Sequence, residues 1–368
     1  MTVTTQLSST YNKKILKQAH NRKRILVAPL CWGLGHATRC IPIINALISQ
    51  GLEPVIASDG GALELLKKEF PKLSAFELPS YNISYSKKSN GFKLKFLKAS
   101  PHILKTIKRE RKRIEQLVET ENIDGIISDN RFGVRHKAIP SVYITHQLNV
   151  LSGKTTWLSS KWHQDIIKKF DECWVPDFEH SPNLSGELGH TKRQLNNVKY
   201  IGPLSRFKKQ TSEENIDILV ILSGPEPQRT QLEKKLLFEL KNKKESVVFV
   251  RGLVEGKQKM TIIDNIKMYN YMTSNELETA INSSKLIVSR SGYTTIMDLA
   301  KLGKKAIFIP TPGQFEQLYL AKKLSENSSI PFIEQDNFSF KDLNFNTTYT
   351  GFKAMEAECN YKKLFGLF

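Results

Sequence analysis

Short apolar runs recur along the chain, and several of them lead through a turn of small or polar residues into a helical pattern. In the first half these runs lie at Lys23–Pro29, Pro54–Ser58, Ile123–Ser128 and Ser141–Thr145. Apolar runs of this length between turn residues are typical of buried strands. When such strands alternate with helices, the pattern predicts parallel βαβ units that bind ligands at the carboxyl ends of their strands.

A second series of strands follows, with runs at Asp217–Leu222, Glu245–Val250, Leu286–Ser289 and Ala306–Pro310. The stretch Val198–Arg206 separates the two series, and we expect it to be an interdomain linker. The sequence therefore predicts an α/β protein of two doubly wound, Rossmann-like domains with a cleft between them. The expected divisions are a flexible basic extension (1–22), a first domain (23–202), a second domain (203–345) and a C-terminal segment (346–368) that packs back towards the first domain.

Composition places the chain among ordinary globular proteins, since 40% of its 368 residues are hydrophobic and 25% are charged. No apolar run reaches the roughly 18–20 residues that span a bilayer, and the first residues lack the apolar centre of a secretion signal. The four cysteines have no metal-ligand or redox spacing, so we expect free thiols in a reducing cytoplasm.

The net charge of +19 is concentrated in one block. Lys87–Arg113 contains eleven Lys or Arg and one Glu, mixed with apolar residues. A solvated helix face would explain this block, and so would an anionic membrane surface, because apolar residues alternate with the basic ones. No nucleic-acid-binding motif accompanies the charge, so nucleic acid is not expected as a partner. The membrane interpretation predicts a peripheral protein on the inner face of the membrane.

Two side chains of the first domain are candidates for acid–base chemistry. His36 follows the turn Gly33-Leu34-Gly35 at the start of a predicted helix, where the helix dipole disfavours the imidazolium ion. Asp129 lies just past the strand Ile123–Ser128 and could instead cap a turn. Because both residues follow strands of one sheet, we expect the Asp129 carboxylate to orient the His36 ring as a general base.

The second domain contains a candidate phosphate site. The apolar strand that ends at Ser289 runs through Arg290-Ser291-Gly292 directly into a helical pattern from Tyr293 to Lys301, and Gly303 ends that helix. A helix that begins at such a turn presents free backbone N–H groups to an anion. Asp298 lies one turn further on, where a carboxylate can accept hydrogen bonds from a ribose. These features outline a nucleotide-sugar site.

The motif Arg290-Ser291-Gly292-x-x-Thr295-x-x-Asp298 resembles that of the glycosyltransferase family 28 C-terminal domain, with Asp in place of the family's Glu. The Gly33–His36 turn and the His–Asp pairing resemble glycosyltransferases of the two-domain GT-B class. The resemblance implies a GT-B fold and a nucleotide-sugar-binding second domain. The donor-binding residues that it implies are Arg206, Ser223, Gly224, Tyr271, Met272, Arg290, Ser291, Gly292, Thr295, Asp298, Glu316 and Gln317.

Four further residues complete the expected site. Arg229 follows the Ser223-Gly224 turn in a predicted helix and is either a phosphate contact or a solvent-exposed arginine. Gly33, Gly35 and His146 are expected to bind the acceptor in the first domain. The sequence His146-Gln147-Leu148-Asn149 departs from the H-E-Q-N of the peptidoglycan enzyme of family 28, which argues against the same acceptor.

The sequence thus predicts an inverting, UDP-sugar-dependent glycosyltransferase of cell-envelope or glycan biosynthesis with a lipid-linked or membrane-associated hydroxyl acceptor. No Asp-x-Asp motif is present, so neither a metal nor another cofactor is expected. Two alternatives remain open. One is a non-hydrolysing UDP-N-acetylglucosamine 2-epimerase, which resembles the same fold, and the other is a non-catalytic nucleotide-sugar-binding subunit docked at a membrane.

Overall fold

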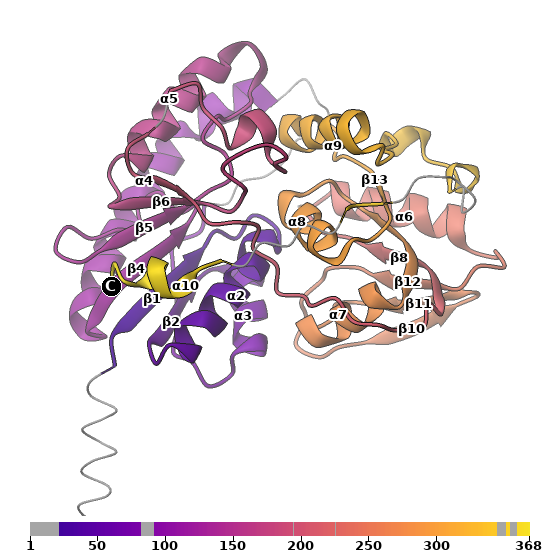
Figure 1. The fold of residues 1–368 in the computed structure, drawn as a ribbon, viewed down its shortest axis with the longest axis horizontal. Helices are drawn as coiled ribbons and strands as arrows, with labels where there is room; N and C mark the ends of the chain where they lie inside the picture. Colours follow the sequence, from indigo (N-terminus) through magenta and orange to yellow (C-terminus); the bar gives the residue numbers. More distant parts are fainter. Residues whose placement is uncertain (1–21, 82–91, 194, 225, 344–350, 354–358) are drawn as a thin grey trace, which may run out of the picture.

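The computed structural model describes residues 22–81, 92–193, 195–224, 226–343, 351–353 and 359–368. Almost all of the expected N-terminal extension, the first part of the basic block and much of the expected C-terminal segment lie outside these ranges. Figure 1 shows two units side by side, each made of a sheet and its helices. The C-terminus lies on the unit that contains β1 and β4.

The first sheet has seven parallel strands in the order β3-β2-β1-β4-β5-β6-β7. The chain runs outwards from β1 in both directions, which is the doubly wound arrangement. The strands are β1 (Arg24–Pro29), β2 (Glu53–Ser58), β3 (Ala75–Glu77), β4 (Ile123–Asp129), β5 (Ser141–Ile144), β6 (Glu172–Val175) and β7 (Val198–Tyr200). The helices are α2 (Gly35–Ser49), α3 (Gly60–Glu69), α4 (Phe92–Thr120) and α5 (Thr156–Ile167), with short 3-10 turns η2 (Gly153–Thr155) and η3 (Gly186–Leu188).

The second sheet has six strands in the order β10-β11-β9-β8-β12-β13, and only β10 runs antiparallel to its neighbour. Its strands are β8 (Ile216–Ile221), β9 (Val247–Val250), β10 (Met260–Ile263), β11 (Ile266–Tyr269), β12 (Ser284–Ser289) and β13 (Ala306–Phe308). Its helices are α6 (Gln228–Leu240), α7 (Ser274–Asn282), α8 (Tyr293–Leu302) and α9 (Phe315–Ser328), followed by η4 (Gln335–Asn337), η5 (Phe340–Asp342) and the C-terminal α10 (Tyr361–Phe365).

The structure corrects the expected linker at its beginning. Val198–Tyr200 is not a connection between domains but the edge strand β7, whose three residues pair with β6. The sequence did not indicate this strand because three residues with an exposed Lys199 in the middle give no periodic signal. The crossing to the second sheet therefore follows Tyr200.

Apolar packing covers both faces of each sheet. In the first domain α2 and α3 pack on one face, while α4 packs on the other through Ile114 and Leu117. In the second domain α6 covers one face, and α7 and α8 cover the opposite one. One continuous apolar cluster includes α2 of the first domain and α8 of the second, so the two domains share a buried contact.

The chain end returns to the first domain. Helix α10 contacts α2, and Lys23 donates a hydrogen bond to the backbone carbonyl of Phe368. The Phe368 ring lies over Gly125, where an added Cβ would meet a ring carbon at 2.3 Å, and it also contacts the ring of Trp174. Gly125 therefore makes room for the last residue of the chain.

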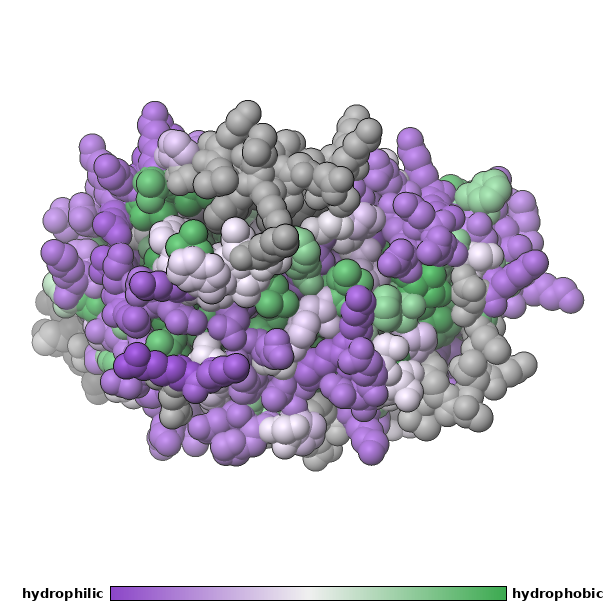
Figure 2. Space-filling view, turned by 90° about the horizontal axis from the view of Figure 1, so that it is seen from above, coloured by the Kyte–Doolittle hydropathy of each residue, from purple (hydrophilic) through white to green (hydrophobic). Residues whose placement is uncertain are grey.

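The part of the chain that the structure describes has no helix long and apolar enough to cross a membrane. Seen from above in Figure 2, the surface is largely hydrophilic, with hydrophobic residues exposed between the polar ones on both halves.

Candidate active site between the two sheets

His36 and Asp129 lie together at the carboxyl ends of the two central strands of the first sheet. Strand β1 pairs with β4 so that Pro29 is opposite Asp129, and α2 begins a few residues after β1 with His36 in its first turn. His36 Nδ1 is 2.9 Å from Asp129 Oδ1. The interpretation of Asp129 as a simple turn cap is therefore wrong, because its side chain belongs to this pair.

Arg39 is the residue of this cluster that the sequence analysis missed. Its Nε donates a 2.5 Å hydrogen bond to Asp129 Oδ2, and its Nη2 donates to Asp129 Oδ1. The Asp129 side chain is fully buried and that of Arg39 is 1% exposed. The only available signal was spacing, since residues three apart on a helix lie on the same face and Arg39 follows His36 by three.

The charges around Asp129 set the ionisation of the cluster. Burial by itself raises the pKa of the Asp129 carboxyl, but Arg39 and His36 together hold this pKa well below its usual range. For His36, burial lowers the pKa, Asp129 raises it and Arg39 lowers it again, with a net shift below 6.5. At neutral pH the cluster therefore holds a carboxylate, a guanidinium and a neutral imidazole.

His146 continues this network towards the second domain. It follows β5, and its Nδ1 lies 3.0 Å from Arg39 Nη1, while its Nε2 lies 2.8 Å from Glu316 Oε1 in the first turn of α9. The side-chain amide of Gln147 also donates to Glu316. The His146 ring stacks on the ring of Tyr293 with 4.2 Å between centroids and 5° between planes. His146 thus bridges the two domains beside the His36–Asp129 pair.

Two glycine turns face each other across the domain boundary. A Cβ placed on Gly33, which has φ +78°, would lie 3.6 Å from the backbone of Gly224. Thr294, near the start of α8, donates a 3.0 Å hydrogen bond to the carbonyl of Gly35. Among the residues that the structure describes, a Cβ on Gly224 or on Gly292 would meet nothing within 4 Å. The loops after β8 and β12 therefore lie against Gly33 and Gly35, the turn that leads into His36, and Gly224 and Gly292 leave space free of the described side chains.

The start of α8 offers backbone donors to that space. Gly292 is the N-cap residue of α8, and no side chain caps this helix end. Hydrogen bonds join this loop to α9 and to the loop after β13. Ser291 Oγ donates to the Gln317 carbonyl at 2.8 Å, and Gln317 Oε1 accepts from Thr311 N at 2.8 Å. Uncapped N–H groups at a positive helix end are suited to an anion such as a phosphate.

Asp298 of α8 is buried, and the half-buried Arg206 lies beside it. Ser205 Oγ donates to Asp298 Oδ1 at 2.7 Å, and burial raises the pKa of Asp298 to about 6 although Arg206 lowers it. Arg206 Nε and Nη1 are buried and make no hydrogen bond to the residues that the structure describes, while the guanidinium lies 4.7 Å from the ring centre of Phe207. The structure thus places Arg206 next to the Asp298 carboxyl group, the two residues that the family resemblance assigns to the donor.

The structure gives two of the expected phosphate ligands other partners. Arg290 donates to the carbonyls of Ile309, Pro310 and Gln228 and to the side chain of Gln335, and its side chain is buried. Arg229 is not solvent-exposed but 5% exposed, and it pairs with the carboxylates of Glu226 and Glu233. Both guanidinium groups hold loops of the second domain together in this structure.

The remaining expected residues lie around the same boundary. Tyr271 is 7% exposed, and Lys68 from α3 of the first domain lies 5.2 Å from its ring centre. Met272, Ser223 and Thr295 are half-buried. Within the ranges that the structure describes, no three His, Cys, Asp or Glu side chains converge as ligands of a metal ion would.

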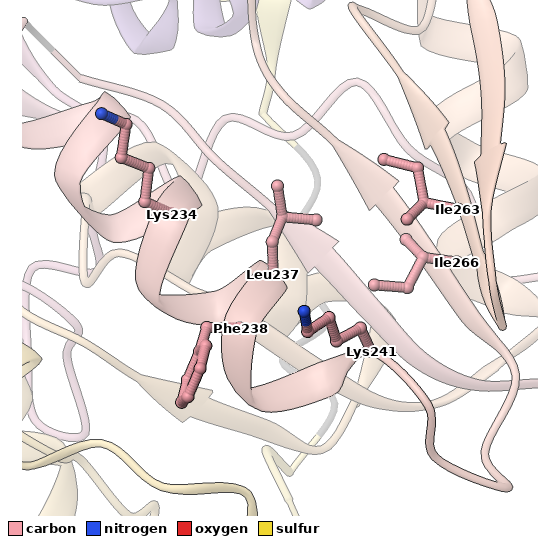
Figure 3. Close-up of a pocket in the computed structure, with 6 residues that line it drawn as sticks. All are labelled: Lys234, Leu237, Phe238, Lys241, Ile263 and Ile266. Carbon is pink, nitrogen blue, oxygen red and sulfur yellow. The ribbon is translucent and has the colours of Figure 1, made fainter.

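A separate pocket of about 280 Å³ lies on the outer side of the second domain (Figure 3). It is lined by residues of α6 and of the β10–β11 hairpin, and Figure 3 shows Leu237, Ile263 and Ile266 around it. None of the residues expected in the site contributes to its wall. Because α6 covers the sheet face opposite α8, this pocket is remote from His36.

Two doubly wound domains with their strand ends facing one site define the GT-B class of glycosyltransferase folds, and solved structures bear this out. The structure of MurG from Acinetobacter baumannii superposes with a TM-score of 0.53 at 13% identity and covers 94% of this chain and 98% of that chain. The structure of the glycotransferase of kitacinnamycin gives 0.59 at 13% identity, with 94% of each chain covered. The fold is GT-B, as the sequence predicted.

The family resemblance is also confirmed, because residues 216–359 match the glycosyltransferase family 28 C-terminal domain. The UDP-N-acetylglucosamine--N-acetylmuramyl-(pentapeptide) pyrophosphoryl-undecaprenol N-acetylglucosamine transferase of Haemophilus ducreyi is 22% identical over 205 residues, which are 54% of this chain and 55% of that protein. The match thus spans about half the length of this relative. An uncharacterized glycosyltransferase of Methanosarcina mazei is 22% identical over 311 residues, which are 77% of this chain and 79% of that protein.

Proposed function

We propose that the chain is an inverting, metal-independent glycosyltransferase that moves a sugar from a UDP-sugar to a hydroxyl group. The observation that carries this proposal is the position of His36 and Asp129 beside the open space bordered by Gly224 and Gly292. A base and an anion-binding helix end on opposite sides of one space are what a displacement at an anomeric carbon requires.

In the proposed reaction, Nδ1–H of His36 donates to Asp129, and Nε2 takes the proton of the acceptor hydroxyl. The acceptor oxygen forms its bond to the anomeric carbon while the bond from that carbon to the diphosphate oxygen breaks on the opposite side, which inverts the configuration. The electron pair leaves with the diphosphate, whose charge is stabilised by backbone N–H groups at the start of α8 and by Arg206. Asp129 stabilises the imidazolium ion that forms.

The donor nucleotide is proposed from the family. Relatives matched by this chain carry UDP-N-acetylglucosamine in their names, whereas a fold neighbour, the spinosyn rhamnosyltransferase SpnG, was solved with thymidine diphosphate. Asp298 would accept from the ribose, the loop at Tyr271 and Met272 would hold the base, and Glu316 and Gln317 would contact the sugar. Arg290 and Arg229 support the loops behind the ligand in this proposal, because their donors are already occupied.

The acceptor is proposed to be lipid-linked, and the protein to be peripheral on the cytoplasmic face of a membrane. Helices α4 and α5 pack on the two sides of Phe132, since Ile103 and Ile107 of α4 cluster with it and the ring of Trp162 of α5 lies 5.3 Å away. The exposed side chains of these helices include Trp157 (70% exposed) and Leu158 (54% exposed) of α5 and several lysines and arginines of α4, and this surface is called the exposed rim. Apolar side chains beside basic ones are suited to an anionic lipid surface.

A binding and transfer experiment tests the function. Purified protein is titrated with UDP-, GDP- and dTDP-sugars by calorimetry, and product formation is then followed with the bound donor and hydroxyl acceptors, for the parent and for His36→Ala. We expect UDP-sugar binding in both proteins and transfer by the parent alone. Interconversion of the free nucleotide sugar without any acceptor would identify an epimerase instead. Binding with no chemistry under either condition would identify a non-catalytic subunit.

A further inference from the structure

Strand β10 has the composition of an interior strand but lies at the edge of the second sheet. It pairs with β11 on one side, and among the residues that the structure describes no strand pairs with its other side. Its sequence is Met-Thr-Ile-Ile, and all of its residues are exposed, Ile262 by 63%. An exposed apolar edge strand is a template on which a further strand can pair through its backbone.

The side chains of β10 are apolar on both faces of the sheet. Ile263 lies opposite Ile266 of β11, and both line the pocket beside α6. Because successive side chains of a strand point to opposite faces, Met260 and Ile262 lie on the other face of the sheet. Strands that are apolar on both faces are normally covered on both, whereas β10 is exposed.

The pocket beside this edge combines apolar walls with positive charge. Figure 3 shows Leu237 and Lys241 opposite Ile263 and Ile266 of the hairpin. The lining also includes Phe238 and Lys234, and both lysines are exposed. Among the residues that the structure describes, neither lysine forms an ion pair, because the carboxylates of Glu226 and Glu233 pair with arginines instead. The pocket therefore suits a ligand that is both apolar and acidic.

Charge also decides between a second copy of the chain and a different partner. Exposed Lys257 precedes β10 and exposed Lys267 lies on β11, while the hairpin contains a single acidic residue, Asp264. A second copy, with its net charge of +19, would bring the same lysines towards one another. A segment with carboxylates would instead offer partners to Lys234 and Lys241. The charges thus favour an acidic partner over self-association.

We propose that β10 and the adjacent pocket form a docking site for an extended, acidic and apolar segment of a partner protein. The segment adds as a strand to the free edge of β10, places an apolar side chain in the pocket, and brings carboxylates to Lys234 and Lys241. The pocket lies on the sheet face opposite α8, so a bound partner leaves the proposed active site open. This docking goes beyond the proposed function and does not depend on it.

Synthetic peptides and the intact protein test this proposal. A panel of fluorescent peptides of about eight residues, within the usual range of strand lengths, has glutamates at both ends and a central apolar stretch that varies across the panel. We expect saturable binding by fluorescence anisotropy, with slower hydrogen exchange in residues 260–263. The same peptides with lysines for glutamates, or with N-methyl groups on alternate backbone amides, should bind at least about tenfold more weakly. The first lose the charge pairing and the second the backbone hydrogen bonds.

Substitutions in the protein locate the binding. Lys234→Glu combined with Lys241→Glu should weaken binding of the acidic peptides at least about tenfold and strengthen that of the lysine peptides. The matched control is Lys72→Glu combined with Lys322→Glu, which reverses the charge of two exposed lysines elsewhere and should leave the affinity close to that of the parent.

Several results would overturn the proposal. These are the absence of binding by every acidic peptide, equal binding of the N-methylated peptides, and an affinity that Lys234→Glu with Lys241→Glu leaves unchanged. Slower exchange in β10 that follows dimerisation of the protein would identify a second copy as the occupant. Slower exchange with vesicles of anionic lipid, but not with the peptides, would identify a membrane instead. None of these measurements depends on sugar transfer, so they are independent of the test of the proposed function.

Discussion

At the scale of single residues, the pKa of the His36 ring depends on burial and on neighbouring charges more than on its place at a helix end. Burial lowers the pKa of its ring, Asp129 raises it, and Arg39 lowers it again. The proposed general base is therefore unprotonated at neutral pH and becomes protonated below 6.5. The rate of transfer should follow this ionisation.

His36→Ala should reduce kcat by about 10²–10⁴-fold, the usual contribution of general base catalysis, with UDP affinity nearly unchanged. Asp129→Asn should reduce kcat less, because the ring remains while its orientation and the charge that stabilises imidazolium are weakened. The parent rate should decrease as the pH falls below 6.5, since the imidazole then binds the proton that it must accept. Steady-state kinetics and calorimetry measure these quantities, and transfer by His36→Ala at the parent rate would remove the His–Asp pair from the mechanism.

Asp298→Ala should weaken UDP binding by about 1–3 kcal/mol, the range for the loss of a hydrogen bond to a charged acceptor. Because the pKa of Asp298 is raised to about 6, the free protein takes up a proton below that pH and loses the carboxylate. UDP affinity should therefore fall as the pH decreases through about 6 in the parent, and this dependence should vanish in the variant. The matched control is Asp217→Ala. Asp217 lies at the start of β8, and its carboxylate pairs with Lys285. Unchanged calorimetric affinity in Asp298→Ala would contradict the ribose assignment.

At the scale of elements, the two ends of α8 use glycine for different reasons. Gly292 at the N-cap has φ −73°, which any residue can adopt, and a Cβ there would project into open space. Gly303 at the C-cap has φ +66° in the left-handed region, where a side chain is strained. The first glycine leaves room for a ligand, while the second ends the helix.

Gly292→Ala should therefore lower UDP affinity by at least about tenfold, or about 1.4 kcal/mol, without changing thermal stability, because the added methyl group occupies the space proposed for the diphosphate. Gly303→Ala should do the reverse and cost about 1 kcal/mol of stability while UDP affinity is kept. Calorimetry and thermal unfolding on both variants separate the two effects. Full UDP affinity in Gly292→Ala would place the diphosphate elsewhere.

At the scale of the whole molecule, contacts on several sides of the site join the two domains. Glu69 of α3 accepts hydrogen bonds from the backbone and side chain of Ser274 at the start of α7. The Tyr319 hydroxyl of α9 accepts a 2.8 Å hydrogen bond from the backbone N–H of Glu187 in the first domain. His146 and Glu316 add the contact beside His36. These contacts hold the proposed base and the proposed anion-binding loops in a fixed position relative to each other.

The exposed rim, formed by Trp157, Leu158 and the basic residues of α4, should bind the protein to an anionic membrane. The parent should co-sediment with vesicles that contain acidic lipid, and less so at high salt, because each basic residue near such a surface contributes about 1 kcal/mol that salt screens. Trp157→Ser should reduce this binding. Phe238→Ser is the matched control, since Phe238 is 71% exposed against 70% for Trp157 but lies on α6 of the other domain. Equal loss in both variants, or no pelleting of the parent, would contradict attachment through this rim.

The sequence by itself determined the elements whose signal is local. The strands β1, β2, β4, β5, β8, β9, β12 and β13 were expected because buried parallel strands are continuous apolar runs between turn residues. The strands β3, β6, β7, β10 and β11 were not expected. None of the residues of β3, β7 and β10 is buried, so these edge strands lack the continuous buried apolar run that marks a central strand. The motif Arg290–Asp298 likewise indicated the family without any structure.

Only the tertiary structure decided which charged groups meet. The pairing of Pro29 with Asp129 places His36 and Asp129 in contact, as the order of the strands suggested, but the same register also brings Arg39 and His146 into the cluster. It also turns Arg290 and Arg229, which the motif and the helix position had directed to a phosphate, towards carbonyls and carboxylates of their own domain. Hydrogen bonds between residues a hundred positions apart depend on strand register and helix packing, which no local pattern in the sequence specifies.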